Sequence, residues 1–422
     1  MTKTIADAVS GLLRDDHAIS ISAYDGSRTG PASADFELEI ANDRGLAYLI
    51  TAPGDLGMAR AYVSGDLVLH GVHPGDPYPA LVVLKDHLRF RVPAPGEVLE
   101  IVRSVGLSHL RPPAPPPEEA LPRWRRVVEG LRHSMGRDAE AISHHYDVSN
   151  AFYELVLGPS MAYTCALYER AGATLEEAQF AKFDLVCRKL ALQPGHRLLD
   201  VGCGWGTMVR HAAREYGVRA LGVTLSLEQA QWAKAAIDRE GLGDLAEVRH
   251  LDYRDVVERD FDAVSSIGLT EHIGVRNYAD YFEFLRDRLT PGGRLLNHCI
   301  TRRDNLHRAS AGAFIDRYVF PDGELAGSGT IEAAVQDAGM EVQHTENLRQ
   351  HYALTLAGWN RNIVENWDAC VAEVGLGTAR VWGLYIAGSR LGFERGEIEL
   401  HHVLATRPGV GGPASFPLRP DW

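Results

Sequence analysis

The sequence predicts an α/β protein with a Rossmann-like, mostly parallel sheet, an antiparallel C-terminal edge and a smaller, β-rich α+β N-terminal domain. Three observations lead to this fold class. From Thr174 onward, apolar segments of strand length alternate with helical segments, which is typical of a parallel sheet covered on both faces. A glycine-rich turn at 202–206 follows the first of these strands. Residues 18–75 instead hold alternating stretches such as AISISAY and FELEIAND between Gly, Asp and Pro turns.

The elements of the larger domain can be placed in order along the chain. Strands are expected at residues 196–201, 219–224, 247–252, 261–268 and 293–300. Helices are expected at residues 174–192, 207–217 and 226–241. Two late segments are expected to close the sheet as an antiparallel, hairpin-like edge, at residues 340–347 and 397–406. In open sheets of this kind, ligands bind beyond the carboxyl ends of the strands.

The domain boundary is expected at RPPAPPPEEALP, residues 111–122, because closely spaced prolines favour stiff, extended chain. Residues 1–110 then form the N-terminal domain, and residues 139–422 form the larger domain. The segment between them, 111–138, is the linker together with a basic amphipathic helix, RWRRVVEGLRHSMGR.

Composition narrows the class of protein. With 422 residues, of which 45% are hydrophobic and 23% charged, the chain is long enough for two globular domains. A formal charge of −13 argues against generic nucleic-acid binding, which needs a basic face. The five cysteines, an odd number without metal-type spacing, are expected to be reduced thiols. The sequence shows neither a signal peptide nor a long apolar run, so we expect a cytoplasmic protein.

The glycine turn, VGCGWG, predicts a ligand site at the first strand. Gly202, Gly204 and Gly206 allow a ligand to approach the backbone, and N–H groups of the following helix point toward it. The spacing is GxGxG rather than GxGxxG, and the second strand ends without an acid, which argues against a dinucleotide. The nucleoside of S-adenosylmethionine is favoured, with Asp200 orienting the loop or the methionine amine. A merely tight turn is the alternative.

The ends of the next two strands supply further candidates. Thr224 and Gln229 are placed to hold the ribose, although Ser226 followed by Gln229 is also a capping box for a helix start. Asp252 suits the exocyclic amine of adenine, and Tyr253 suits its ring face. A solvated acid beside a half-buried tyrosine is the alternative for the last pair.

These segments, together with HHYDVSNAFYELVLGPSMAYTCALYE, GLTEHIG and NYADYF, resemble the cyclopropane fatty acid synthase family, which includes the mycolic acid cyclopropane synthases. The resemblance covers roughly residues 139–405 and implies the fold of a class I S-adenosylmethionine methyltransferase. In that family, a cis double bond of a lipid acyl chain attacks the sulfonium methyl, and bound bicarbonate helps to remove a proton from the resulting cation.

The resemblance also implies the site residues. The bicarbonate site carries over, motif by motif, to Cys165, Glu271, His298, Ile300 and Tyr352, with Cys165 and Ile300 acting chiefly through backbone amides. The cofactor-binding residues expected are Tyr163, Thr164, Asp200, Gly202, Cys203, Gly204, Gly206, Thr224, Leu225, Gln229, Asp252 and Tyr253.

Each catalytic candidate also has a structural interpretation. Cys165 suits a small buried hydrophobe, Glu271 a loop acid, His298 a core histidine and Tyr352 a packing residue. The surrounding motifs favour the functional role in each case. One departure from many relatives is Thr270, where they carry an aromatic residue before the glutamate.

That departure leaves the product open. Loss of a proton from the added methyl group closes a cyclopropane ring, whereas loss from a chain carbon leaves a methylene, the precursor of a methyl branch. The neighbouring aromatic candidates for stabilising the cation are Tyr146, Tyr163, Tyr168 and Tyr281.

Access to lipid is assigned to the basic amphipathic helix at 123–137, because such helices bind anionic membrane surfaces. Its alternative is an interdomain helix, and the N-terminal domain is a second candidate for lipid presentation. The expected partners are an unsaturated phospholipid or fatty acyl substrate and the inner face of the membrane, with a homodimer left open. Two other functions compete: a small-molecule methyltransferase and a non-enzymatic lipid-binding protein with a relict cofactor pocket.

Overall fold

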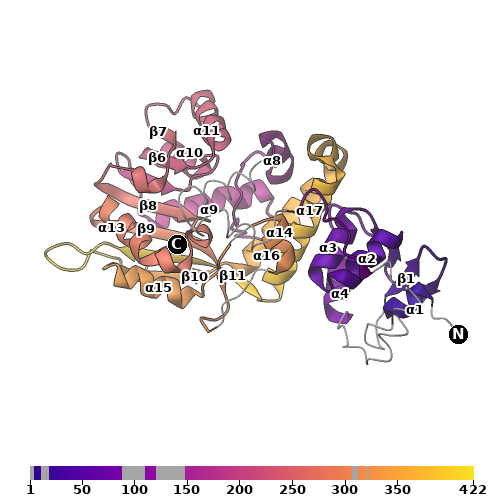
Figure 1. Cartoon of the computed structure of the whole chain (residues 1–422). Coiled ribbons are helices and arrows are strands. Elements are labelled where there is room, and N and C mark those ends of the chain that lie inside the picture. Colours follow the sequence, from indigo (N-terminus) through magenta and orange to yellow (C-terminus); the bar gives the residue numbers. More distant parts are fainter. Residues whose placement is uncertain (1–3, 11–18, 88–109, 120–147, 307–311, 321–322) are drawn as a thin grey trace. The chain divides into compact units, whose positions relative to one another are not determined.

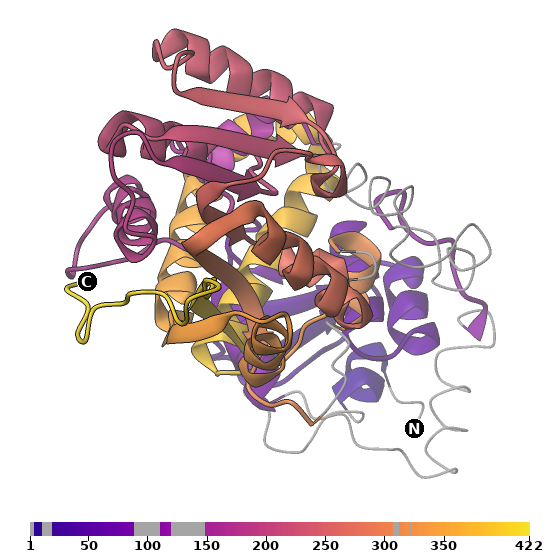
Figure 2. The same ribbon diagram turned by 90° about the vertical axis from the view of Figure 1, so that its left-hand side faces the viewer.

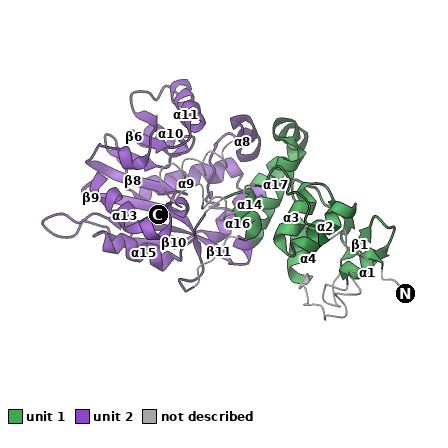
Figure 3. Cartoon of the chain, in the orientation of Figure 1, with its two compact units in different colours: residues 1–122, 312–321, 359–391 green, residues 123–311, 322–358, 392–422 purple. Residues whose placement is uncertain are grey.

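The computed structural model describes residues 4–10, 19–87, 110–119, 148–306, 312–320 and 323–422. Contacts divide the chain into two compact units, which Figure 3 colours separately. Unit 1 comprises residues 1–122, 312–321 and 359–391, and unit 2 comprises residues 123–311, 322–358 and 392–422. The units therefore do not follow chain order, and the expected domain limits of 1–110, 111–138 and 139–422 stay a prediction. The basic helix expected at 123–137 lies outside the described residues.

Unit 2 is built on a seven-stranded sheet, counted over the described residues, with the order β10-β11-β9-β8-β5-β6-β7. The strands are β5 (Arg197–Val201), β6 (Arg219–Thr224), β7 (Ala246–His250), β8 (Phe261–Ile267), β9 (Leu289–Arg302), β10 (Glu341–Asn347) and β11 (Ile398–Thr406). Strands β5 to β9 pair in parallel, and β11 pairs antiparallel with both β9 and β10. The predicted parallel sheet with an antiparallel C-terminal edge is confirmed.

The two edge strands are not joined by a short hairpin. Between them in the sequence lie two long helices, α16 (Arg349–Glu365) and α17 (Trp367–Glu394). Within the part of the chain that the structure describes, no helix is both long enough and apolar enough to cross a bilayer.

Helices cover both faces of the sheet in unit 2 (Figures 1 and 2). Neighbouring residues of β9 show this, because successive side chains of a strand point to opposite faces. Leu296 packs with Phe183 and Val209, whereas Leu295 packs with Tyr281. The first face carries α9 (Leu175–Lys189), α10 (Thr207–Tyr216) and α11 (Leu227–Arg239), and the second carries α13 (Tyr278–Arg288) and α15 (Ser328–Asp337). Unit 2 also contains two shorter helices, α8 (Asn150–Leu157) and α12 (Thr270–Ile273), and the first part of α16.

Helix α9 begins where the sequence predicts. The Thr174 hydroxyl accepts a hydrogen bond from the Glu177 backbone N–H, and the Glu177 carboxylate accepts one from the Thr174 N–H. This capping box satisfies two of the donors that a helix leaves unpaired at its start. The helix ends at Lys189, whose fully buried side chain enters the site described below.

Unit 1 contains a four-stranded sheet over its described residues, in the order β2-β1-β3-β4. Its strands are β1 (Ser20–Ala23), β2 (Arg28–Thr29), β3 (Glu37–Ile40) and β4 (Leu67–His70), and its helices include α1 (Ile5–Ser10), α2 (Asp43–Thr51), α3 (Asp55–Val63), α4 (Tyr78–His87) and α14 (Ala313–Tyr318). The α+β character is confirmed, with helices in the middle of a stretch expected to be mostly strand. Asn42 explains the first of them, because its side chain caps α2 by accepting from the Gly45 N–H.

Candidate active site

The glycine turn lies between β5 and α10, at the carboxyl edge of the parallel strands. Gly202, Gly204 and Gly206 have φ values of 77°, 52° and 70°, a region that favours glycine. Their surroundings differ. A Cβ added to Gly204 would meet no described atom within 4 Å, whereas one added to Gly206 would lie 3.1 Å from the Cβ of Ala233. Gly204 therefore faces open space, and Gly206 allows the turn to lie close to α11.

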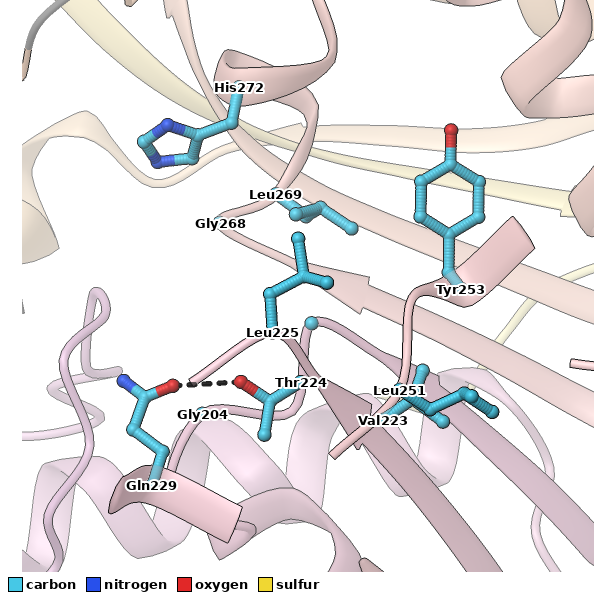
Figure 4. Close-up of a pocket in the computed structure, with 11 residues that line it drawn as sticks. Gly204, Val223, Thr224, Leu225, Gln229, Leu251, Tyr253, Gly268, Leu269 and His272 are labelled. Carbon is cyan, nitrogen blue, oxygen red and sulfur yellow. Dashed lines mark hydrogen bonds between the residues drawn. The ribbon is translucent and has the colours of Figure 1, made fainter. Parts of the chain in front are cut away.

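A pocket opens beside this turn (Figure 4). Its lining includes six of the predicted cofactor residues: Gly202, Gly204, Thr224, Leu225, Gln229 and Tyr253. The other lining residues were not predicted from the sequence; they are Val223, Leu251, Gly268, Leu269 and His272. All five lie near or beyond the carboxyl ends of β6, β7 and β8, where an open sheet of this kind places its ligands.

The hydrogen bonds of Gln229 show how two predicted roles are combined. The Ser226 hydroxyl caps α11 by accepting from the backbone N–H of Gln229 (3.2 Å). The Gln229 side chain does not complete a capping box; its Oε1 accepts from the Thr224 hydroxyl instead (2.9 Å, Figure 4). The side-chain amide is thus held at the pocket wall with its NH₂ group available for a ligand such as ribose.

Asp200 and Cys203 support the turn from behind, and neither is among the lining residues of the described pocket. Asp200 is buried, and its carboxylate accepts from the Ser265 hydroxyl (2.6 Å). Burial raises the pKa of Asp200 to about 6, against the opposing effect of that hydrogen bond. The Cys203 sulfur fills the space beside Gly222, where an added Cβ would lie only 2.8 Å from it.

At the end of β7, Asp252 and Tyr253 have different environments. The Asp252 carboxylate accepts two hydrogen bonds from the Arg254 guanidinium, at 2.6 and 2.9 Å, and does not line the described pocket. Tyr253 does line it, and its ring is held edge-on against Tyr281 and Phe284, each with a centroid distance of 5.2 Å. The aromatic ring predicted to contact adenine, Tyr253, is therefore present in the pocket. The Asp252 carboxylate instead binds Arg254.

A second cluster of predicted site residues, formed by Glu271 and Ile300, lies next to the pocket. Glu271 directly precedes the lining residue His272 on α12. Glu271 Oε1 accepts a hydrogen bond from the Ile300 backbone N–H (2.6 Å). Its other oxygen, Oε2, is buried without a hydrogen-bond partner among the described residues. Burial raises the pKa of Glu271 to about 7, which the Ile300 N–H opposes. The Ile300 N–H, expected to bind an anion directly, is here used to hold Glu271.

His298 lies on β9, two residues before Ile300, and is fully enclosed by protein. Hydrogen bonds join its Nε2 to the Thr164 hydroxyl and its Nδ1 to His402 Nε2, both at 2.8 Å. Burial lowers the pKa of His298 well below its ordinary value. Thr164 and its neighbour Tyr163, predicted to bind the cofactor, are not among the lining residues of the described pocket. The Thr164 side chain instead hydrogen-bonds to His298.

Cys165 and Tyr352 meet at the start of α16. The Cys165 thiol is buried beside the carbonyl oxygens of Ala166 (3.2 Å) and Leu348 (3.8 Å). The Leu348 carbonyl also accepts the Tyr352 N–H (3.2 Å), and the Tyr352 ring lies 4.5 Å from that of Phe393. Burial raises the pKa of Cys165, as expected of an unreactive thiol.

The neighbourhood of Thr270 is polar. Its hydroxyl donates to Asn297 Oδ1 (2.6 Å) inside the protein. Of the aromatic candidates, Tyr281 is buried with its hydroxyl 2.6 Å from that of Ser266, and the Tyr168 hydroxyl donates to the Leu354 carbonyl (3.3 Å). Tyr146 lies outside the described residues.

Two buried lysines were missed by the sequence analysis. Lys182 and Lys189 lie on α9 with fully buried side chains. The Lys182 ammonium group has no hydrogen-bond partner among the described residues, and burial lowers its pKa well below its ordinary value. A signal was present, because positions 182, 186 and 189 share one face of a helix and Val186 belongs to the core.

The family follows from these features and from comparison with known proteins. The family model described as "Mycolic acid cyclopropane synthetase" matches residues 133–403. The chain belongs to the mycolic acid cyclopropane synthetase family. It is an S-adenosylmethionine-dependent methyltransferase, and the predicted resemblance and the predicted class I fold are both confirmed.

Three similar proteins illustrate the relationship. A "Probable fatty acid methyltransferase" of Mycobacterium tuberculosis is 61% identical over 406 residues, which cover 96% of this chain and 95% of the relative. The cyclopropane synthase MmaA2 from Mycobacterium tuberculosis has a TM-score of 0.60 and 32% identity, covering 65% of this chain and 99% of its own. The mycolic acid cyclopropane synthase CmaA1, complexed with SAH and CTAB, has a TM-score of 0.60 and 30% identity, covering 64% and 98%.

Proposed function

We propose that this family member transfers the methyl carbon of S-adenosylmethionine to the cis double bond of an unsaturated acyl chain in a membrane phospholipid, and that the resulting cation loses a proton to close a cyclopropane ring. The name of the 61% identical relative supports a fatty acyl substrate. The observation that carries the proposal is the buried Glu271 carboxyl, whose Oε2 lacks a described partner, next to the cofactor pocket.

The pocket fits the cosubstrate. The open space at Gly204 accommodates a ligand against the backbone, and the amide of Gln229 and the ring of Tyr253 suit a ribose and an adenine. S-adenosylmethionine supplies an electrophilic methyl group when bound. The residues around it position that methyl and exclude water, because most of the lining is apolar or backbone.

The second cluster fits bicarbonate. Bicarbonate supplies a base for the proton of the cation when bound. Glu271 Oε2 is suited to hydrogen bonding with its O–H group, and the Thr164 hydroxyl, which His298 Nε2 holds, is suited to donate to its oxygens. With a pKa of about 7, Glu271 changes protonation near neutral pH, as a group that takes part in proton transfer must.

The experiment is incubation of the purified protein with S-adenosylmethionine and unsaturated phospholipid vesicles, followed by mass spectrometry and NMR of the lipid. Ring protons of a cyclopropane are expected. An exocyclic methylene would assign the other proton loss, and methylation of a small molecule without any lipid product would overturn the proposal.

Two variants test the assignment of residues. Glu271→Gln and His298→Ala should lower kcat by about a hundredfold or more, the range of general acid–base catalysis, while the affinity for S-adenosylhomocysteine stays within about twofold. Losing affinity and turnover together would reassign both residues to the cofactor pocket. The proposal also includes peripheral binding of the protein to an anionic membrane. It leaves open whether the protein forms a homodimer.

A further inference from the structure

A row of polar side chains crosses the antiparallel edge of the sheet. Glu346 on β10 lies opposite His402 on β11, and His402 lies opposite His298 on β9. Residues directly opposite one another in neighbouring strands project from the same face. This face carries α9, because Leu296 and Leu404, two residues along from the histidines, pack against that helix. The three side chains therefore lie in one line beneath α9.

Lys189 at the end of α9 connects the row. Its Nζ lies 2.5 Å from Glu346 Oε2 and 3.1 Å from His402 Nδ1. From there, His402 Nε2 contacts His298 Nδ1, and His298 Nε2 contacts the Thr164 hydroxyl, each at 2.8 Å. The Lys189 side chain is fully buried and Glu346 is about one-third exposed. A continuous hydrogen-bonded row thus runs from the Glu346 carboxylate at the protein surface to the buried Thr164 hydroxyl.

The chemistry of lysine gives this chain a direction. An ammonium group has three N–H donors and no acceptor, so His402 Nδ1 must accept from Lys189. A neutral imidazole carries a single N–H, and burial lowers the pKa of both histidines, which favours their neutral forms. The hydrogen of His402 therefore lies on Nε2 and is donated to His298 Nδ1. The hydrogen of His298 then lies on Nε2, on the side of Thr164.

We propose that Lys189, acting through His402, fixes His298 in its Nε2–H tautomer, so that His298 donates to the Thr164 hydroxyl oxygen and the O–H of Thr164 stays free to donate to the bound anion. The identity of that anion rests on the proposed function. In the opposite tautomer, the Nε2 lone pair of His298 would accept the Thr164 O–H and so remove that donor from the anion. Lys189 and His402 are thus positioning residues, and neither touches the anion.

Glu346 helps to keep Lys189 protonated, which the hydrogen-bonded row requires. Burial lowers the pKa of Lys189, and the Glu346 carboxylate opposes this effect. The partly exposed Glu346 carboxylate is thereby linked to the tautomer of the buried His298, through groups contributed by three strands and one helix.

Three variants test whether the direction of the hydrogen bonds through His402, and not merely the presence of a side chain there, sets the tautomer of His298. Lys189→Met removes the ammonium group while keeping an unbranched apolar side chain. His402→Leu breaks the chain. His402→Gln keeps it, because glutamine offers an oxygen to accept from Lys189 and an N–H to donate to His298, but cannot titrate. His401→Leu is the matched control, since His401 neighbours His402 on β11 and bonds instead to Thr301 (2.7 Å).

The first measurement is ¹⁵N NMR of histidine-labelled protein, with the His298 signal identified by its loss in His298→Asn. The parent, His402→Gln and His401→Leu should show the Nε2–H tautomer of His298. Lys189→Met and His402→Leu should show the Nδ1–H tautomer or a mixture. An Nδ1–H tautomer in the parent, or no change in the last two variants, would overturn the proposal. Circular dichroism establishes that each variant is folded.

The second measurement is the rate of methyl transfer against bicarbonate concentration. Lys189→Met and His402→Leu should raise the bicarbonate concentration needed for half-maximal rate by about tenfold or more, the loss expected for one charge-assisted hydrogen bond. His402→Gln should raise it much less. A changed tautomer with an unchanged bicarbonate dependence would refute the proposed anion while leaving control of the tautomer intact, so the two failures are distinguishable.

Discussion

Replacing Glu271 with glutamine should reduce the dependence of folding stability on pH. Burial raises the pKa of this carboxyl from an ordinary 4.5 to about 7 in the folded state. Between these pH values the folded state binds more protons than the unfolded state, so the free energy of unfolding falls as pH rises through this window. At about 1.4 kcal/mol for each tenfold change in proton affinity, the whole loss is about 3 kcal/mol. Glutamine keeps an oxygen for the Ile300 N–H but carries no charge.

The assay is urea unfolding of both proteins between about pH 5 and pH 8, followed by circular dichroism. The stability of Glu271→Gln relative to the parent should rise by about 2–3 kcal/mol across that range. A difference in unfolding free energy that is the same at every pH reflects the amide itself and does not test the prediction. Glu176→Gln, which removes an exposed carboxyl from α9, controls for the loss of one charge. Parallel curves for Glu271→Gln and the parent would refute the account of a carboxyl destabilised by burial.

Three further substitutions test other features. Gly204→Val should abolish binding of S-adenosylhomocysteine in calorimetry, because the side chain fills open space beside the turn; unchanged affinity would remove the premise. Gly222→Ala should lower the free energy of unfolding by about 1–3 kcal/mol, since its Cβ would lie 2.7 Å from a neighbouring side-chain carbon, and an unchanged denaturation midpoint would contradict this. Replacing Arg123, Arg125 and Arg126 with glutamine should weaken sedimentation with anionic vesicles by at most about 3 kcal/mol and flatten its salt dependence; identical curves would exclude these arginines from the membrane surface.

The glycine turn could be predicted because its signal is local. An apolar strand, three alternating glycines and a helix start lie within about 20 residues, and the structure places Gly204 beside open space. Asp252 shows the limit of such reasoning. The sequence predicts it as the last residue of a strand, whereas β7 ends two residues earlier; Arg254, two residues on, binds its carboxylate, and no spacing rule predicts that contact.

The row through His402 could not be predicted from the sequence. Its strand members, His298, Glu346 and His402, are separated by about 50 residues each, and they meet because the register of β10, β11 and β9 places them side by side. A register is fixed by the burial of whole strands, so it is invisible at any single position. From the sequence alone, Lys189 is simply a lysine near the end of a predicted helix. Its contact with His402 depends on which strand lies beneath that helix.

Unit 1 is formed by three separate segments of the chain, which the ribosome synthesises at different times. About 270 residues lie between position 122, where the first piece ends, and position 391, where the last one ends. At roughly 5–20 residues per second, that interval lasts tens of seconds. Over that time Gly75 lacks the Asn360 side-chain amide that hydrogen-bonds its carbonyl oxygen, and the first piece has no cover from residues 359–391. The first segment of unit 1 is therefore the part of the chain that waits longest for its packing partners during synthesis.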